Sequence, residues 1–525
     1  MANNVPSFSS KSTALPRLAL PTIGNIIFVV LLLILTFNAR QGLLRDGDTG
    51  YHIRTGEIIL QTWRVPTHDP YSFQSPPLEW TAHEWLSEVL MAAIFRWSGL
   101  TGIVLFFASL LALTHWLLYR SLRAPSDAIV LCVIVAVLAS ATSSSHWLAR
   151  PHAFSLLLTV VWYYCLGRFQ YRQDSRIVYY LPPLMLLWVN FHGGFIIALI
   201  LTGIYLVGNV LFAIGANPSE RQGYRRKARQ LLIVLPVLLG ACLINPFGNT
   251  LLQFPFRLTG DRFIMDRVLE FLPPNFHDAL PFKYMLLALV GALALSRSSL
   301  NVIEAALVLL LTYMALYSAR YMSLFAIIVA PILLKTAASG LTRLPDPALE
   351  FYRQRNRILT AIDCNLNGYL WPVAGIIFVS ALALGGRVKF QFDNKRFPVA
   401  AVEFLKREPI SGNMFNNDEF GDYLIFAAWP SYRVFMDGRS DMYGERFISS
   451  YYTIANALPG WRDELAQFDI TWVIFDTESP LTAALQGQND WQPIYSDRIA
   501  TIFVKKTQAH AALLTKYAGV LVARR

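Results

Sequence analysis

Long apolar runs separated by basic loops constrain this chain most. Runs of about 17–22 residues recur up to residue 386, and such runs can cross a hydrocarbon core ~30 Å thick. We identify candidate spans at 20–38, 99–119, 127–146, 152–168, 177–191, 194–214, 230–245, 281–296, 301–317, 321–336 and 368–386. Beyond residue 386 such runs stop. The sequence therefore predicts a mainly α, polytopic transmembrane bundle of about 11 spans over 1–386, followed by a small α/β soluble domain over 387–525.

Basic residues predict how the spans are oriented. Lys11 and Arg17 precede the first span, and the richest basic loops, 221–229 and 335–357, fall on the same side when the spans alternate. The positive-inside rule makes that side cytoplasmic. An odd number of spans then places the C-terminal domain outside a cytoplasmic (inner) membrane. Since the loops account for the net charge of +11, we expect no nucleic-acid partner.

The first outer loop, 39–98, holds the densest set of chemically useful side chains. Two amphipathic segments, at about 48–63 and 82–97, are typical of interfacial helices. Asp46 and Asp48 follow the first span closely, and either carboxylate could act as a general base or, for Asp48, as a ligand of Mg²⁺ or Mn²⁺. Asp-Gly-Asp is also an ordinary turn and helix cap. The candidate binding residues here are His52, one helical turn after Asp48, and His83 and Glu84.

More polar residues fall at the outer ends of later spans. Ionisable groups at membrane depth are costly and often mark function. The predicted topology puts these on the same face as Asp46 and Asp48, which indicates a cavity open to the outside. Arginine there suits a phosphate or pyrophosphate group, although it could simply extend to the interface. The candidate binding residues are Arg150, His152, His192, Arg320 and Tyr321.

The C-terminal region alternates short helical and strand patterns. Strands are expected at 413–416, 433–437, 471–476, 492–496 and 500–504, and helices at 399–406, 421–428, 446–457, 461–468 and 480–486. Its most distinctive run is Phe420-Gly421-Asp422-Tyr423, followed by Phe435-Met436-Asp437-Gly438-Arg439-Ser440-Asp441, which holds an Asp-Gly-Arg-x-Asp turn. This turn could bind a cation or a sugar, but a side-chain turn locked by pairing of Arg439 is the favoured interpretation.

These motifs together resemble the GT-C superfamily of membrane glycosyltransferases. The matching runs are Asp46-x-Asp48-x-Gly-Tyr-His52-Ile-x-x-Gly56-Glu, Val65-Pro66-x-x-Asp69-Pro70-Tyr-Ser72-Phe, Glu84-Trp85-Leu, Arg150-Pro151-His152, Trp188-Val-Asn190-x-His192-Gly193-Gly194 and Asp437-Gly438-Arg439. They look like a bacterial branch related to the protein mannosyltransferases and the lipid-A aminoarabinose transferase. The chain lacks the adjacent Asp-Glu pair of the mannosyltransferases and the Trp-Trp-Asp motif of the oligosaccharyltransferases.

The resemblance implies transfer of a sugar from a polyprenyl-phosphate-linked donor to an acceptor at the outer membrane face, with Asp46 or Asp48 as base or metal ligand. Membrane lipid and a membrane-complex partner are further expected partners. Two alternatives remain open at this point. One is a non-catalytic scaffold or assembly subunit with the same fold. The other is a transporter, which the lack of a convincing internal repeat disfavours.

Overall fold

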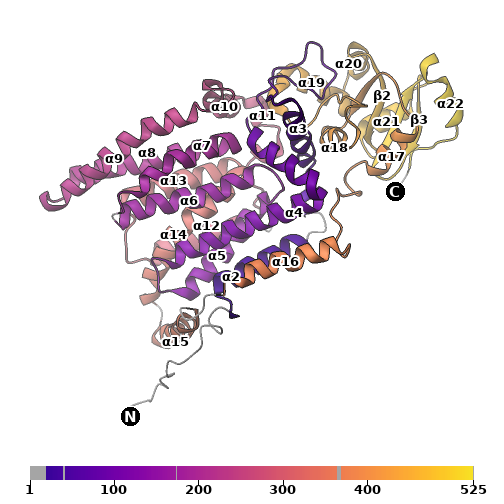
Figure 1. The fold of residues 1–525 in the computed structure, drawn as a ribbon. Coiled ribbons are helices and arrows are strands. Elements are labelled where there is room, and N and C mark those ends of the chain that lie inside the picture. Colours follow the sequence, from indigo (N-terminus) through magenta and orange to yellow (C-terminus); the bar gives the residue numbers. More distant parts are fainter. Residues whose placement is uncertain are drawn as a thin grey trace.

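The computed structural model describes residues 19–38, 42–172, 174–278, 280–343, 345–363 and 368–523. Lys11 and Arg17, which the predicted orientation uses, lie outside these ranges. Helices dominate up to residue 384 (Figure 1). They are α2 (Ile23–Leu33), α3 (Asp48–Thr62), α4 (Trp85–Arg123), α5 (Ile129–Ser143), α6 (His152–Tyr171), α7 (Leu181–Phe191), α8 (Ile196–Gly215), α9 (Pro218–Cys242), α10 (Asn249–Gly260), α11 (Arg262–Met265), α12 (Pro281–Leu295), α13 (Val302–Tyr317), α14 (Met322–Gly340), α15 (Asp346–Asp363) and α16 (Leu370–Leu384).

Several of these helices have the length and composition of membrane spans. Among the described residues, 4 helical segments are long and apolar enough to cross a membrane: Trp85–Arg123, Ile129–His146, Gly193–Gly215 and Ala319–Arg343. Shorter apolar helices, such as Val302–Tyr317 and Leu370–Leu384, lie beside them in the bundle. The chain is a multi-pass membrane protein. Every predicted run contains helix, but the count of about 11 spans is not confirmed, because many of the helices are shorter than a full span.

The first loop differs in one respect from its prediction. The segment 48–63 forms α3, as expected, whereas 82–97 is not a separate helix but the beginning of α4. The two parts of α4 meet at Gly99, where φ is 60° and the helical backbone is interrupted. Positive φ is a conformation that glycine adopts at little cost. The kink therefore lies where the sequence placed the boundary between interfacial segment and span.

The C-terminal domain is a small α/β unit with a four-stranded sheet. Its strands are β1 (Asn413–Asn416), β2 (Ile470–Asp476), β3 (Trp491–Ser496) and β4 (Ala500–Lys505), in the spatial order β1-β2-β4-β3. β1 pairs parallel with β2, and β4 pairs antiparallel with both β2 and β3. The helices around it are α17 (Val399–Arg407), α18 (Asp418–Ala428), α19 (Gly444–Ala455), α20 (Trp461–Gln467), α21 (Pro480–Gln486) and α22 (Ala511–Lys516).

The predicted strand at 433–437 is wrong, and the reason is informative. This segment does not join the sheet: Val434 forms an isolated parallel bridge with Ser72 of the first loop. The Val434 N–H donates to the Tyr71 carbonyl at 3.0 Å. The extended pattern thus serves to join two parts of the chain that are far apart in sequence.

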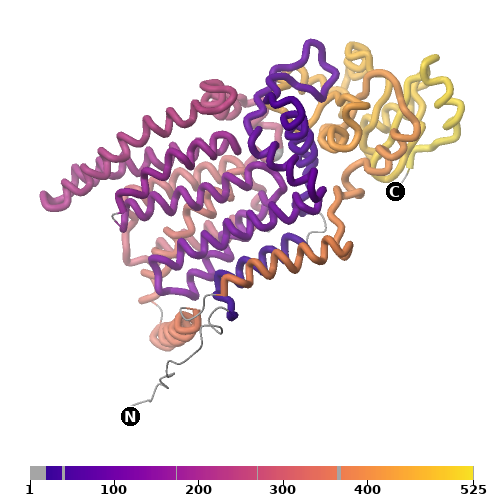
Figure 2. Tube along the Cα trace, in the orientation of Figure 1, coloured from indigo at the N-terminus to yellow at the C-terminus, as the bar shows by residue number. Residues whose placement is uncertain are grey.

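The C-terminal domain packs against the first loop rather than hanging from a linker. α18 lies against α3, and both Figure 1 and Figure 2 show the first loop with α3, in indigo, beside the C-terminal domain at one end of the bundle. The guanidinium of Arg54 on α3 donates to the Phe426 carbonyl of α18 at 2.6 and 3.0 Å. The Trp429 indole N–H donates to the Pro70 carbonyl at 3.3 Å. These contacts bring the two regions around one cavity.

Candidate functional site

A cavity of about 670 Å³ lies where the bundle, the first loop and the C-terminal domain meet. This volume is in the range of small-molecule sites, roughly 300–1,000 Å³. Its polar residues come from three parts of the chain: the start of α3, the ends of later bundle helices that lie nearest the C-terminal domain, and the segment 418–441. Among the predicted site residues, eight line it: Asp46, Asp48, His83, Glu84, Arg150, His192, Arg320 and Tyr321.

Arg150 is the central cation of this wall. Its guanidinium lies 2.8 Å from Asp46, 2.5 Å from Asp48 and 2.7 Å from Glu270. The backbone beside it is held by two hydrogen bonds of Ala149. The Ala149 N–H donates to the Leu43 carbonyl at 2.9 Å, and the Ala149 carbonyl accepts from the Thr49 hydroxyl at 3.1 Å. Arg150 was predicted to bind a phosphate, but the three carboxylates already neutralise its charge. It therefore organises acids rather than offering a free anion site.

Asp46 and Asp48, equivalent in the sequence, differ in the structure. Burial acts to raise the pKa of Asp46, but Arg150 and the Asp48 backbone N–H outweigh it and hold that pKa below its usual range. Burial raises the pKa of Asp48 well above its usual range despite Arg150, with Asp46 and Glu270 adding to the effect. A carboxylate of raised pKa is the better proton acceptor. Asp46 thus suits holding Arg150, and Asp48 suits general-base work.

The C-terminal domain adds a second acidic group to the same wall. Asp422 on α18 and the residues Asp437, Gly438 and Asp441 line the cavity. Asp422 is 4% exposed and accepts from the Gly438 N–H at 3.0 Å. The cap of α18 sets its direction, because the Asn417 side chain accepts from the Phe420 N–H at 3.1 Å.

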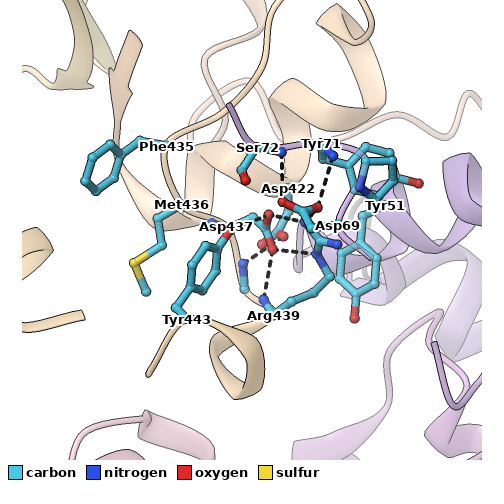
Figure 3. A network of polar contacts seen from close by, with 12 residues as sticks. Tyr51, Asp69, Tyr71, Ser72, Asp422, Phe435, Met436, Asp437, Arg439 and Tyr443 are labelled. Carbon is cyan, nitrogen blue, oxygen red and sulfur yellow. Dashed lines mark hydrogen bonds and ion pairs between the residues drawn. The ribbon is translucent and has the colours of Figure 1, made fainter. Parts of the chain in front are cut away.

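The turn at 437–439 holds the domain in place (Figure 3). Arg439 donates from its backbone N–H to Asp437 at 3.0 Å and from its side chain to both Asp437 oxygens at 2.8 and 2.6 Å. It also donates to Asp69 of the first loop at 2.8 Å. The favoured interpretation of this motif, a turn locked by Arg439, is confirmed. The added contact with Asp69 joins the two regions through a buried ion pair.

Glu84 is surrounded by three histidines. Its carboxylate lies 3.3 Å from His192 Nε2, 3.5 Å from His52 Nε2 and 3.7 Å from His83 Nε2. The Gly194 N–H donates to His192 Nδ1 at 2.9 Å, so the proton of a neutral His192 is on Nε2 and points to Glu84. His83 Nδ1 lies 3.1 Å from the Thr81 carbonyl, which leaves His83 Nε2 as an acceptor at the cavity wall.

Two predicted site residues, His52 and His152, do not line the cavity. His52 is buried between Glu84 and Glu88, 3.1 Å from the latter, and burial lowers its pKa well below the usual range. His152 lies 2.6 Å from the His146 carbonyl, away from the lining. Both support neighbouring groups and do not face the cavity. Helical spacing put His52 near Asp48, but the packing of α3 on α4 turned it inward.

The residues do not fit a resident divalent metal. Within the described part of the chain, no group of three or more His, Cys, Asp or Glu side chains is placed to hold a metal ion. Where Asp46, Asp48 and Glu270 converge, the guanidinium of Arg150 occupies the position between them. The guanidinium thus supplies one positive charge among these acids, and a role for Mg²⁺ or Mn²⁺ stays a prediction.

Part of the cavity wall is apolar. It comes from helices of the bundle: Ile196, Ile197 and Ile200 of α8, Phe254 and Phe256 of α10, Met314 of α13 and Leu324 of α14. α8 and α14 belong to the segments long enough to cross a membrane, so this wall continues into the apolar bundle. Arg320 also lines the cavity, 3.9 Å from Glu270 and 5.3 Å from the Phe271 ring centre.

Sequence reasoning missed Glu270 and Asp422. Glu270 is the single acid in its apolar surroundings at 268–272, within a long predicted outer loop, and that isolation was a usable signal. Asp422 was noted as part of the distinctive run 420–423, but it lies in an amphipathic helix and received no role in the site. Only the docking of α18 on α3 shows that it belongs to the site.

Comparisons with known proteins were made for the whole chain. No family model matches the sequence, and no curated protein matches it significantly. Solved structures with a similar fold include an oligosaccharyltransferase from Archaeoglobus fulgidus, with 13% identity, a TM-score of 0.47, and coverage of 87% of this chain and 68% of that one. Another is ArnT from Cupriavidus metallidurans bound to undecaprenyl phosphate, with 10% identity, a TM-score of 0.46, and coverage of 92% and 98%. Both are GT-C glycosyltransferases, the class that the sequence motifs resemble. Since both TM-scores lie below 0.5, we base the function on the cavity.

Proposed function

We propose that this chain is a membrane glycosyltransferase that moves a sugar from a polyprenyl-phosphate-linked donor to an acceptor bound in the cavity. The mixed polar and apolar lining of the cavity carries this proposal. Its apolar wall, from α8, α10 and α14, suits a prenyl chain, and its polar wall suits a phosphate and a sugar. Arg320 is the arginine that suits the phosphate, since it is 31% exposed and its nearest carboxylate oxygen is 3.9 Å away.

Asp48 takes the role of general base in this reaction. The acceptor O–H or N–H bond breaks as its heteroatom bonds to the anomeric carbon, and the proton passes to Asp48. The bond from the anomeric carbon to the phosphate oxygen breaks at the same centre, so the polyprenyl phosphate leaves with the electron pair. Asp46 keeps Arg150 in place, and Arg150 limits the negative charge around Asp48.

The proposal is tested with the purified full-length protein in lipid nanodiscs. The probes are undecaprenyl-phosphate-linked sugars with membrane extract as the source of acceptor, and the readout is undecaprenyl phosphate released, measured by mass spectrometry. We expect D48N to bind undecaprenyl phosphate but to release it from the donor at least about 100-fold more slowly, as for loss of a general base. R320A should instead weaken binding of undecaprenyl phosphate. E403Q, an exposed carboxylate on α17, serves as the control.

Two outcomes would count against a transferase. Wild-type protein that releases no lipid phosphate from any donor, yet copurifies with a stable membrane complex, would favour the scaffold. Equal rates in wild type and D48N would remove Asp48 from the reaction. Because the Arg150 guanidinium occupies the position between the three acids, we propose that no metal binds there, and EDTA treatment should leave the rate within about twofold of the untreated enzyme. A larger loss, restored by Mg²⁺ or Mn²⁺, would contradict this part.

A further inference from the structure

Asp48 of the first loop meets a carboxyl group from the C-terminal domain. A Cβ atom placed on Gly438 would lie 2.7 Å from an Asp48 oxygen and 2.9 Å from an Asp422 oxygen. The two carboxyl groups thus converge on one point of the cavity wall. Only glycine fits at position 438, because any side chain would separate the two acids or displace them.

Close helix packing brings the two acids together. At Gly50, in the first turn of α3, a Cβ would lie 2.7 Å from the Phe426 Cβ and 2.9 Å from the Asp422 carbonyl of α18. At Gly47 a Cβ would lie 2.7 Å from the Asp422 Cβ. The lack of side chains at these positions lets the backbone of α3 approach α18 directly. The position of Asp422 relative to Asp48 is therefore set by backbone contact, which is more rigid than a contact between long side chains.

The charges around the pair are unequal on its two sides. Asp48 faces the Arg150 guanidinium at 2.5 Å, with Asp46 and Glu270 on the same cation. Asp422 has no cation within ion-pair distance among the described residues; it faces Asp48, Asp437 and the Gly438 N–H. Two adjacent buried carboxyls hold one proton between them until a high pH. Burial, followed by Asp48 and Asp437, raises the pKa of Asp422 well above its usual range. The proton therefore stays on Asp422 while Asp48, beside Arg150, ionises first.

We propose that Asp422 is a positioning residue of the transferase site: its protonated carboxyl donates a hydrogen bond to the Asp48 carboxylate and aims the free oxygen of Asp48 at the acceptor. This inference rests on the proposed function. It makes the C-terminal domain a component of the catalytic centre and not only its cover. Asp422 itself gives up no proton in the reaction; it makes the Asp48 carboxylate available at a lower pH than burial alone would allow.

The pairing is tested without a substrate by labelling with dicyclohexylcarbodiimide, which reacts with protonated carboxyl groups in apolar surroundings. The full-length protein is labelled from pH 5 to 9, and modification of Asp48 is followed by peptide mass spectrometry. In D422A, Asp48 loses a hydrogen-bond donor, so it should keep its proton and its reactivity to a higher pH than in wild type. In D422N the amide can still donate, so the profile should stay close to wild type. D422S provides a second small variant if D422A does not fold.

A matched control and a kinetic measurement complete the test. D497N changes a half-buried carboxyl of the same domain that accepts from the Tyr495 hydroxyl at 2.6 Å and lies outside the cavity lining, and it should leave Asp48 labelling unchanged. D422A should lower kcat by roughly tenfold, as for a lost hydrogen bond to a charged group, with the KM for the donor unchanged. An Asp48 labelling profile that is the same in D422A and wild type overturns the pairing. Labelling still decides this point if wild type turns over no donor, which overturns the proposed function instead.

Discussion

At the scale of single residues, the guanidinium of Arg150 forms ion pairs with three carboxylates at once. Removing one partner of a buried charged cluster costs roughly 3–5 kcal/mol, since the remaining charges lose their compensation. We expect R150A to lower the thermal stability of the detergent-solubilised protein, measured by fluorescence-detected size exclusion after heating. R150A/E270Q should recover part of the loss by removing one uncompensated acid. An R150A protein as stable as wild type would contradict the role given to this cluster.

The raised pKa of Asp48 predicts the pH dependence of transfer. A base must be ionised to accept a proton, so the rate falls as the pH drops through the pKa of Asp48. An ordinary aspartate has a pKa of about 3.9, and burial places that of Asp48 well above it. We therefore expect kcat to decline on acidification at pH values well above 3.9, measured as release of polyprenyl phosphate with the fold monitored by tryptophan fluorescence. A rate that stays constant down to about pH 4 would exclude Asp48 as the base.

At the scale of elements, the contact between α3 and α18 depends on the absence of side chains. A methyl group at Gly50 would meet the Phe426 Cβ at 2.7 Å. Overpacking of this kind costs roughly 1–3 kcal/mol. We expect G50A to lower thermal stability and transfer rate together. G203A is a matched control on a helix of the bundle, because no atom lies within 4 Å of its Cβ position; it should be neutral or slightly stabilising.

The local elements could largely be predicted from the sequence, because they depend on near neighbours. Hydrophobic runs located the bundle helices, and all the predicted helices of the C-terminal domain are present. The strand at 433–437 could not be assigned correctly, because Val434 pairs with Ser72, far away in the sequence. The interfacial segment at 82–97 was identified, but its continuation through Gly99 into one bent helix was not. Such errors come from tertiary contacts that local periodicity does not contain.

The candidate site was predictable to a smaller extent. Topology placed Asp48, Arg150 and Arg320 on one face, and the structure brings them to one cavity. The ion pairs that decide their roles were not predictable, because Arg150 was expected to face a phosphate and instead binds three acids. The contribution of Asp422 was missed for a related reason, since charge patterns along a chain do not show which helices dock.

At the scale of the whole molecule, a buried ion pair links the C-terminal domain to the first loop. The Arg439 guanidinium lies 2.8 Å from the Asp69 carboxylate. Loss of Arg439 leaves Asp69 and Asp437 buried without their cation, at a cost of roughly 3–5 kcal/mol. We expect R439A to increase hydrogen exchange at both 69–73 and 434–443, and R439K to restore little because lysine lacks the fork geometry. Hydrogen exchange that rises in only one of the two segments would contradict stabilisation of both segments by this ion pair.

The same pair makes docking sensitive to acid. Burial acts to raise the pKa of Asp69, but Arg439 and the Ser72 and Tyr71 groups outweigh it and hold that pKa below its usual range. The stabilisation is therefore complete above the ordinary pKa of about 3.9 and is lost as the pH falls through the lowered value. The acid limb of transfer due to Asp48 lies at higher pH, so the rate falls before the domain detaches.

The contact between Arg54 and the Phe426 carbonyl has a consequence for the synthesis of the protein, because the two residues are 372 positions apart in the chain. A ribosome that adds about 5–20 residues per second needs roughly 20–75 s to cover that distance. For that interval the nascent chain carries the first acids of the site while their partners on α18 do not yet exist. Under the proposed function, a chain released early lacks the α18 side of the cavity, so we expect full transfer activity only after α18 has been synthesised and has docked on α3.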